Sequence, residues 1–150
     1  MQLCITLQGE SFEPFEVLAR WHGQLQAQGH PHSAAESLFI GRVRGEAADG
    51  SSLAALELEH YPGMTERQLE HLAQGCMARH DARSGLIQHR IGRVLPGEAI
   101  VLVAIGADRR GPAQRCCQEL LEALKHEAPF WKREWRRDGS STWITGNTPF

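Results

Sequence analysis

Two lysines near the carboxyl end of the chain are the residues best suited to chemistry. Lys125 and Lys132 are the only lysines among the 16 Lys and Arg side chains, so ordinary positive surface charge is carried by arginine. A lysine amine can lose its proton and act as a base, a nucleophile or a covalent acceptor when its surroundings lower its pKa, whereas arginine stays protonated. The alternative is that both are solvated lysines near a helix end, which is the commoner role of a lysine.

The elements that position these lysines can be predicted from the residues around them. Residues Gly111 to His126 are predicted to form a helix, because apolar side chains recur there every three or four residues. Pro129 ends this helix, and a strand-like aromatic segment from Phe130 to Arg136 follows. A chain reversal at Pro129 would bring Lys125 close to Lys132. Two like charges held together lower each other's pKa.

Four sequence blocks stand out, namely APFWKRE (Ala128–Glu134), LELEHYPGMTE (Leu56–Glu66), HRIGRVLPGE (His89–Glu98) and GRVR (Gly41–Arg44). Together they resemble one known family, the large, catalytic subunit of molybdopterin synthase. They occur in the order that the family shows, and the similarity covers roughly Phe39 to Glu134. Any one block alone would be a weak signal, whereas four in register are specific.

The resemblance implies a sulfur transfer in molybdenum cofactor biosynthesis. In enzymes of this kind, a small ubiquitin-like sulfur-carrier subunit gives sulfur from its C-terminal thiocarboxylate to cyclic pyranopterin monophosphate. Two such transfers make the dithiolene of molybdopterin. The resemblance also implies a homodimer of this chain within a heterotetramer that carries a small subunit at each end. Because the sulfur comes from the partner, we expect no metal and no bound cofactor.

The resemblance places two arginine-containing segments at the substrate. The segment Arg42-Val43-Arg44 ends a predicted strand, where alternation puts both guanidinium groups on one face, and an arginine fork suits a phosphate. The pair Asp108-Arg109 comes just before a helix start, where free N–H groups and the helix dipole favour anions. The alternative for both segments is ordinary solvated charge. The family usually has His where this chain has Asp108, so a possible proton carrier is missing here.

The lysines are the catalytic residues that the resemblance implies. Lys125 is expected to perform acid–base or covalent chemistry, with a transient amide to the partner's terminal glycine as one option. Lys132 is expected to orient the substrate and to stabilise the oxyanion that forms at the thiocarboxylate carbonyl. Both lysines, together with Arg133 and Glu134, are predicted to bind substrate. For the last two residues, an exposed ion pair on a strand stays open as the alternative.

Length and composition limit the other possibilities. The 150 residues are 41% hydrophobic, enough for one ordinary core, so we expect a single domain spanning residues 1–150. The net charge of -2 argues against a nucleic-acid binder, and no apolar run suits a membrane span or a secretion signal. We therefore expect a cytoplasmic protein. The 4 cysteines form no C-x-x-C pair, and His30 and His32 have no acidic or cysteine neighbour in sequence, so no metal site is predicted.

The predicted order of elements indicates an α+β domain with helices on one side of a largely antiparallel sheet. The apolar run from Ala99 to Ile105 should be a central strand. Thr65 and Gln68 are predicted to form a capping box at a helix start, and Thr142 to Thr145 a short strand with Trp143 facing the core. The resemblance implies the α/β hammerhead fold with a small additional β subdomain.

Two other classes of function stay open. A non-catalytic adaptor that binds a ubiquitin-like sulfur-carrier protein would keep its partner after loss of both lysines. An Arg-rich RNA-binding domain would show salt-sensitive RNA affinity, which the balanced charge of the chain argues against.

Overall fold

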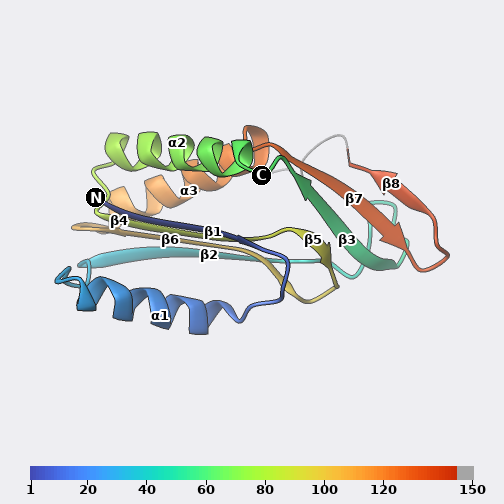
Figure 1. Cartoon of the computed structure of the whole chain (residues 1–150), viewed down its shortest axis with the longest axis horizontal. Helices are drawn as coiled ribbons and strands as arrows, with labels where there is room; N and C mark the ends of the chain where they lie inside the picture. Colours follow the sequence, from blue (N-terminus) through green and yellow to red (C-terminus); the bar gives the residue numbers. More distant parts are fainter. Residues whose placement is uncertain (145–150) are drawn as a thin grey trace.

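The computed structural model describes residues 1–144, which form three helices and eight strands (Figure 1). The helices are α1 (Pro14–Ala27), α2 (Met64–Arg79) and α3 (Arg110–His126). The strands are β1 (Gln2–Gln8), β2 (Ala35–Arg42), β3 (Leu53–His60), β4 (Ser84–Arg90), β5 (Gly92–Val94), β6 (Ala99–Ala107), β7 (Phe130–Arg136) and β8 (Ser141–Trp143). None of these helices is long and apolar enough to cross a membrane.

The larger of two sheets has the strand order β1-β4-β6-β2. Strand β6 pairs antiparallel with both β2 and β4, whereas β1 pairs parallel with β4. The prediction that the apolar run from Ala99 to Ile105 forms a central strand is confirmed, because β6 has a neighbour on each side. A buried strand of this kind needs apolar side chains on both faces.

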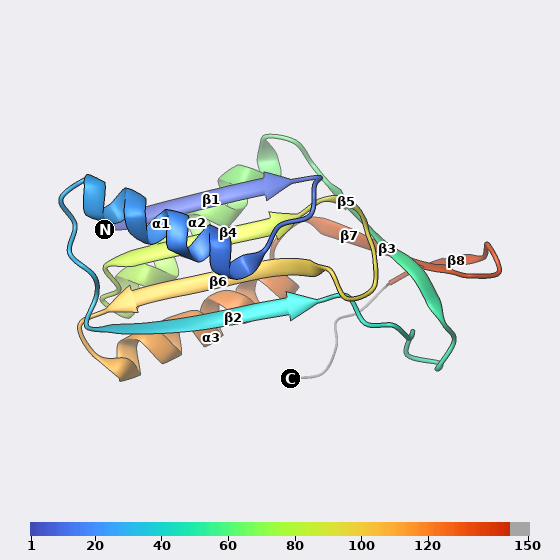
Figure 2. The same cartoon turned by 90° about the horizontal axis from the view of Figure 1, so that it is seen from below.

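Helices cover both faces of this sheet (Figures 1 and 2). Along β6, Val103 and Ile105 pack with α2 and α3, while the alternate residues Leu102 and Ala104 pack with Val17 and Trp21 of α1. Successive side chains of a strand point to opposite faces, so one apolar strand serves two cores. The predicted α+β class with largely antiparallel pairing is confirmed. The prediction of helices on one side holds for α2 and α3 but not for α1.

The smaller sheet has the order β5-β3-β7-β8 with antiparallel pairing and extends beyond one end of the larger sheet (Figure 2). Its core contains the buried residues Val43, Leu58 and Val94. The buried side chain of Arg90 joins the two parts, since its Nη2 donates to the carbonyl oxygens of Gly9 and Arg93. This sheet corresponds to the small β subdomain that the resemblance implied.

Two local predictions were wrong. The capping interaction of α2 lies two residues earlier than predicted, with the Glu66 carboxylate accepting from the backbone N–H of Gly63. Thr65 is instead buried inside the first turn, where its hydroxyl donates to the carbonyl oxygen of Pro129. Trp143 does not face the core, because it stays 43% exposed on β8. The predicted end of that strand, Thr145, lies outside the described residues.

Candidate active site

A cavity of about 780 Å³ lies where the end of β2, the last turn of α3 and strand β7 meet. Its walls combine the two sheets, since β2 and β6 belong to the larger sheet and β3 and β7 to the smaller one. The polar and charged residues that line it are Arg42, Arg44, Glu46, His89, Lys125, His126, Lys132 and Glu134. The predicted lysines and the first arginine segment therefore share one cavity.

The predicted site residues of strand β7 lie on two different faces, because side chains alternate along a strand. Lys132 and Glu134 line the cavity, as does Phe130. Arg133 belongs to the opposite face, where its guanidinium carbon lies 4.3 Å from the ring centroid of Trp135 and its Nε donates to Ser141 Oγ at 2.9 Å. The structure thus brings Glu134 to the lysines but directs Arg133 toward β8.

Electrostatics distinguishes Lys132. Burial first, and the positive charge of Lys125 second, lower the pKa of the Lys132 amine below its ordinary value. Lys125, in the last turn of α3, and Lys132, in the middle of β7, are neighbours in space as predicted, although they are seven residues apart in sequence. An amine with a lowered pKa gives up and takes back a proton more readily near neutral pH.

The arginine segment is held through its middle residue. Val43 is buried in the core of the smaller sheet, and its backbone exchanges hydrogen bonds with Gly97 and Glu98, at 2.9 and 3.0 Å. Arg42 and Arg44, on either side, are exposed at the cavity. Arg42 Nη1 also donates to the carbonyl oxygen of Gly97 at 3.3 Å, which leaves its other N–H groups for a ligand. Backbone anchoring at Val43 thus holds two guanidinium groups at the cavity, where their N–H donors suit an anion such as a phosphate.

His89 lines the cavity, although the sequence did not predict it as a site residue. Its ring is buried and stacks on Phe130, and Nδ1 donates to the carbonyl oxygen of Arg90 at 2.7 Å. Burial, with a smaller contribution from the charge of Lys132, lowers the pKa of His89 to about 4 although the Arg90 carbonyl opposes the shift. The imidazole is therefore neutral at pH 7. The sequence feature that could have identified His89 is the position of a histidine within strand β4, which is buried along its length.

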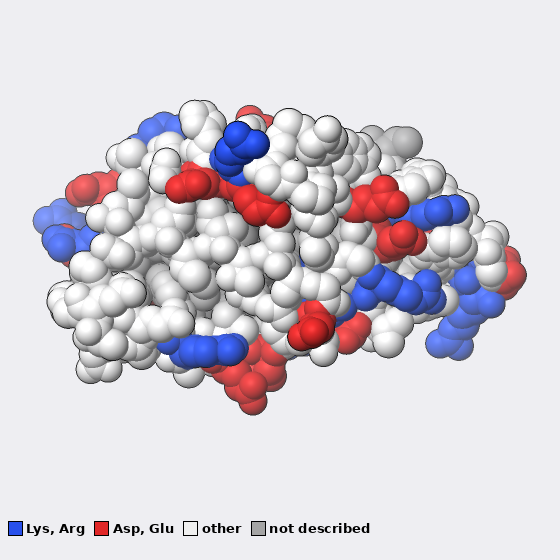
Figure 3. Space-filling model, in the orientation of Figure 1, with Lys and Arg blue, Asp and Glu red and all other residues white. Residues whose placement is uncertain are grey.

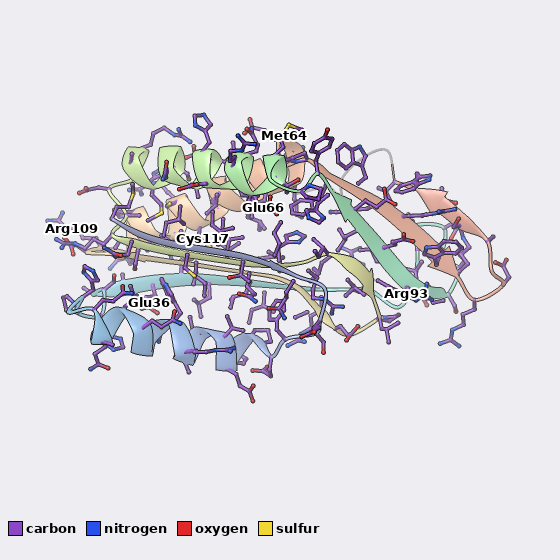
Figure 4. The ribbon with its side chains drawn as sticks, in the orientation of Figure 1. Glu36, Met64, Glu66, Arg93, Arg109 and Cys117 are labelled. Atoms are coloured by element: carbon purple, nitrogen blue, oxygen red, sulfur yellow. The ribbon has the colours of Figure 1, made fainter. Side chains whose placement is uncertain are left out.

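The pair Asp108-Arg109 lies at the other end of α3, where Figure 4 places Arg109. These residues line a separate hollow of about 680 Å³, and Asp108 pairs with Arg83 at 2.6 Å. At a rise of 1.5 Å per residue, the helix separates Arg109 from Lys125 by roughly 24 Å. Within one chain, the structure does not bring Arg109 to the lysines.

Charge and metal-ligating groups give two further observations. On the face shown in Figure 3, basic and acidic side chains are interspersed and form no continuous basic patch. Among the described residues, two groups of side chains could hold a metal ion, namely His22, His32 and Glu36, and Cys76, His80 and Glu119. Neither group lines the cavity.

Comparison with known proteins gives consistent matches. A sequence model described as "MoaE protein" matches residues 11–127. The molybdopterin synthase catalytic subunit of Ralstonia nicotianae is 43% identical over 116 residues, which are 77% of this chain and 65% of that relative. The chain therefore spans slightly less than two thirds of this relative.

Solved structures match over a larger share of both chains. The molybdopterin biosynthesis MoaE protein from Burkholderia ambifaria has a TM-score of 0.74 and 40% identity, covering 95% of this chain and 89% of that one. A complex of subunits 1 and 2 of molybdopterin-converting factor from Helicobacter pylori has a TM-score of 0.73 at 20% identity, covering 95% and 90%. The second likeness shows a shared fold.

Proposed function

The chain belongs to the MoaE protein family, and we propose that it acts in the cytoplasm as the catalytic subunit of a molybdopterin synthase. In this proposal it transfers sulfur from the C-terminal thiocarboxylate of a small ubiquitin-like partner to cyclic pyranopterin monophosphate. The curated name of the Ralstonia relative and the joint structure of two subunits from Helicobacter pylori support an enzyme that works with a partner.

One observation carries the proposal: the only two lysines of the chain line a single cavity with Arg42 and Arg44. The arginines supply fixed positive charge for the substrate phosphate, because guanidinium groups bind phosphate oxygens through paired N–H donors. The lysines supply amines, one of them with a lowered pKa. An anion clamp beside a titratable amine is the combination that the reaction requires.

The chemistry assigns each lysine a separate task. After sulfur has bonded to the substrate, a nucleophile must attack the carbonyl carbon so that the bond from carbonyl to sulfur breaks and sulfur stays on the pterin. Lys125 serves as the base that deprotonates water, or as the nucleophile that takes the partner's acyl group as an amide. Lys132 stabilises the negative charge that develops on the carbonyl oxygen.

The other predicted residues take supporting roles. Glu134 shares the cavity with both lysines and is placed to accept a hydrogen bond from an amine or from the substrate. Arg133 does not contact the substrate in this proposal. It stabilises the pairing of β7 with β8 through its contacts with Trp135, Trp143 and Ser141. Asp108 and Arg109 contribute to the same substrate only from a second copy of the chain, which fits the predicted homodimer.

The test is conversion of cyclic pyranopterin monophosphate to molybdopterin by this chain and a thiocarboxylated small subunit. We expect product from the wild type and a near-complete loss with Lys125→Ala. Lys125→Arg keeps the positive charge but removes the amine chemistry, so it should fail as well. Arg137→Ala, at an exposed turn, is the control and should keep full activity.

A non-catalytic adaptor makes a different prediction for the same reagents. It would bind the small subunit in the wild type and in both Lys125 variants, and no mixture would form molybdopterin. Binding without product in the wild type would therefore reject the enzyme. Product formation that survives Lys125→Arg would instead limit Lys125 to an electrostatic role.

A further inference from the structure

Helices α2 and α3 bring four metal-binding side chains together outside the cavity. Cys76 lies in the last turn of α2 and His80 directly follows this helix as its C-cap. Cys116 and Glu119 lie one turn apart on α3, which runs beside α2 over the same face of the larger sheet (Figure 1). The two sulfur atoms are 3.6 Å apart, and Nε2 of His80 contacts the carboxylate of Glu119. The ligand atoms of Cys76, His80 and Glu119 all lie within 4.8 Å of one another.

Burial differs across the cluster in a way that suits an ion entering from solvent. Cys76 and Cys116 are fully buried at 0% exposure, while the side chains of His80 and Glu119 are 20% and 40% exposed. The cysteines are free thiols, and their separation is well above the S–S bond length of about 2.05 Å. The sulfurs therefore form the closed inner side of the cluster, and the imidazole and carboxylate form its open side.

We propose that Cys76, His80, Cys116 and Glu119 form a binding site for a thiophilic divalent cation, specifically Zn²⁺. A Zn–S bond of about 2.3 Å in a tetrahedral site places two sulfurs roughly 3.8 Å apart, close to the separation in this structure. Thiolate, imidazole and carboxylate are the three ligand types that Zn²⁺ accepts in proteins. Cys116 joins the group of Cys76, His80 and Glu119 through its sulfur, 3.6 Å from that of Cys76. In this proposal, His80 and Glu119, which contact each other in the structure, turn toward the ion to complete four ligands.

Proton and charge balance supports the site. Binding releases the two thiol protons, and two thiolates, one carboxylate and Zn²⁺ carry a net charge of about -1. Arg79 offsets this charge, since its Nε donates to Glu119 Oε1 at 2.9 Å while His80 contacts Oε2.

A metal ion at this site would stabilise the fold and would take no part in sulfur transfer. None of its four side chains lines the cavity, but α3 also carries Lys125 in its last turn. A bound ion would fasten α2 to α3 and hold the helix that presents this lysine. An ion that binds only the folded chain raises the melting temperature as its concentration increases.

A neighbouring cysteine provides a matched control. Cys117 is also buried on α3, next to Cys116 in sequence, but it faces the larger sheet and interacts with Ser37, as its position in Figure 4 illustrates. Replacing Cys117 by serine removes a buried thiol without touching the proposed site. The cluster of His22, His32 and Glu36 is a second control, because it offers nitrogen and oxygen ligands but no sulfur.

The experiment is titration of the reduced chain with Co²⁺ as a spectroscopic substitute for Zn²⁺. We expect a thiolate-to-cobalt charge-transfer band and intense visible bands of tetrahedral Co²⁺, both saturating at one equivalent and both removed by added Zn²⁺. The charge-transfer band should be lost in Cys76→Ser and in Cys116→Ser and retained in Cys117→Ser and in His22→Ala. His80→Ala and Arg79→Ala should weaken Co²⁺ binding by at least about tenfold.

Three results would overturn the proposal. One is the absence of a charge-transfer band in the wild type, including the case in which Co²⁺ binds with nitrogen and oxygen ligands alone. Another is a band that survives both cysteine replacements. The third is loss of the band in Cys117→Ser with retention in Cys116→Ser. If a cysteine variant fails to fold, the partly exposed His80→Ala decides the question, because unchanged Co²⁺ affinity in that variant rejects the site.

Discussion

The imidazole of His89 lies flat against the ring of Phe130, with ring centroids 4.2 Å apart and planes inclined by 10°. His89 belongs to β4 of the larger sheet, and Phe130 is the first residue of β7 in the smaller sheet. Because Nδ1 donates to the Arg90 carbonyl, the neutral ring is fixed with Nε2 as an acceptor. This stacked pair joins the two sheets at the wall of the cavity.

The stacked histidine should make the fold sensitive to mild acid. The pKa of His89 falls from 6.5 to about 4 on folding, so the unfolded chain binds the proton more readily. The free energy of unfolding should therefore decrease as pH falls from 6.5 toward 4, by up to about 3 kcal/mol from this residue. Denaturant unfolding at pH 7 and pH 4.5 measures the change, and His89→Gln should show a smaller loss than the wild type.

Exposed His71 provides the comparison for this experiment. His71→Gln should lose as much stability between the two pH values as the wild type, since it removes an exposed imidazole and leaves the buried ring of His89 in place. An equal acid loss in His89→Gln and the wild type would show that the buried ring is not the cause.

The pKa of Lys132 can be measured directly, because the chain contains only two lysines. Labelling lysine side chains with ¹³C or ¹⁵N gives two amine signals to follow by NMR. We expect one of them, lost in Lys132→Gln, to titrate below the ordinary value of about 10.4. Lys125→Gln should raise the pKa of Lys132, because it removes the neighbouring charge but leaves the larger effect of burial.

The same lowered pKa has a consequence for stability. The unfolded chain holds the Lys132 proton to higher pH than the folded chain does, so stability should rise with pH between the folded pKa and about 10.4. A Lys132 signal that titrates at its ordinary pKa, with no response to Lys125→Gln, would show that the two amines do not interact.

The sequence predicted the elements that carry the cavity better than it predicted their arrangement. Helix periodicity and Pro129 located the end of α3 and the strand β7 that follows it. The resemblance grouped Arg133 with Lys132 and Glu134, whereas strand alternation puts Arg133 on the opposite face. Such local patterns are fixed by backbone geometry. Helix α1 could cover either face of the larger sheet, because β6 offers apolar side chains on both faces. A strand that is apolar on both faces, as in the run from Ala99 to Ile105, does not indicate which of them the helix covers.

Contacts between segments that are distant in sequence were the other feature that the sequence did not predict. The spacing of the cysteines in sequence predicted no metal site, because the 3.6 Å approach of Cys76 and Cys116 depends on how α2 packs on α3. Likewise, no acidic residue stands beside His32 in sequence, whereas the fold brings Glu36 and His22 to it. The separation of Arg109 from Lys125 follows from helix length, which the sequence supplied. The resemblance assigned Arg109 and Lys125 to the same substrate but implied no distance between them.

Gly106 in β6 should be intolerant of a side chain. A Cβ atom at this position would approach the side chains of Ser33 and Ser84 closer than 3.0 Å, and these two hydroxyls already contact each other at 3.4 Å. Gly106→Ala should therefore lower the free energy of unfolding by about 1–3 kcal/mol, as overpacking does elsewhere. Chemical denaturation measures this effect.

Gly23 in α1 is the matched control for that replacement. A Cβ atom there meets nothing within 4 Å, and the residue lies in an exposed part of the helix. Gly23→Ala should raise the free energy of unfolding by about 1 kcal/mol, because alanine favours a helix interior over glycine. Equal effects of the two replacements would contradict the close approach at Gly106.

The separation of Arg109 from Lys125 allows a direct test of a site shared between two copies. If each site takes Lys125 from one copy and Arg109 from the other, Lys125→Ala and Arg109→Ala should each be inactive alone. Refolding an equal mixture of the two variants makes half of the dimers mixed. One site in each mixed dimer then has both native residues, so about a quarter of wild-type molybdopterin formation should return. Mixing Lys125→Ala with Lys132→Ala is the control and should restore nothing, because both lysines line one cavity of the same chain. No recovery from the first mixture, with mixed dimers demonstrated by differently tagged copies, would confine Arg109 to a role outside the shared site.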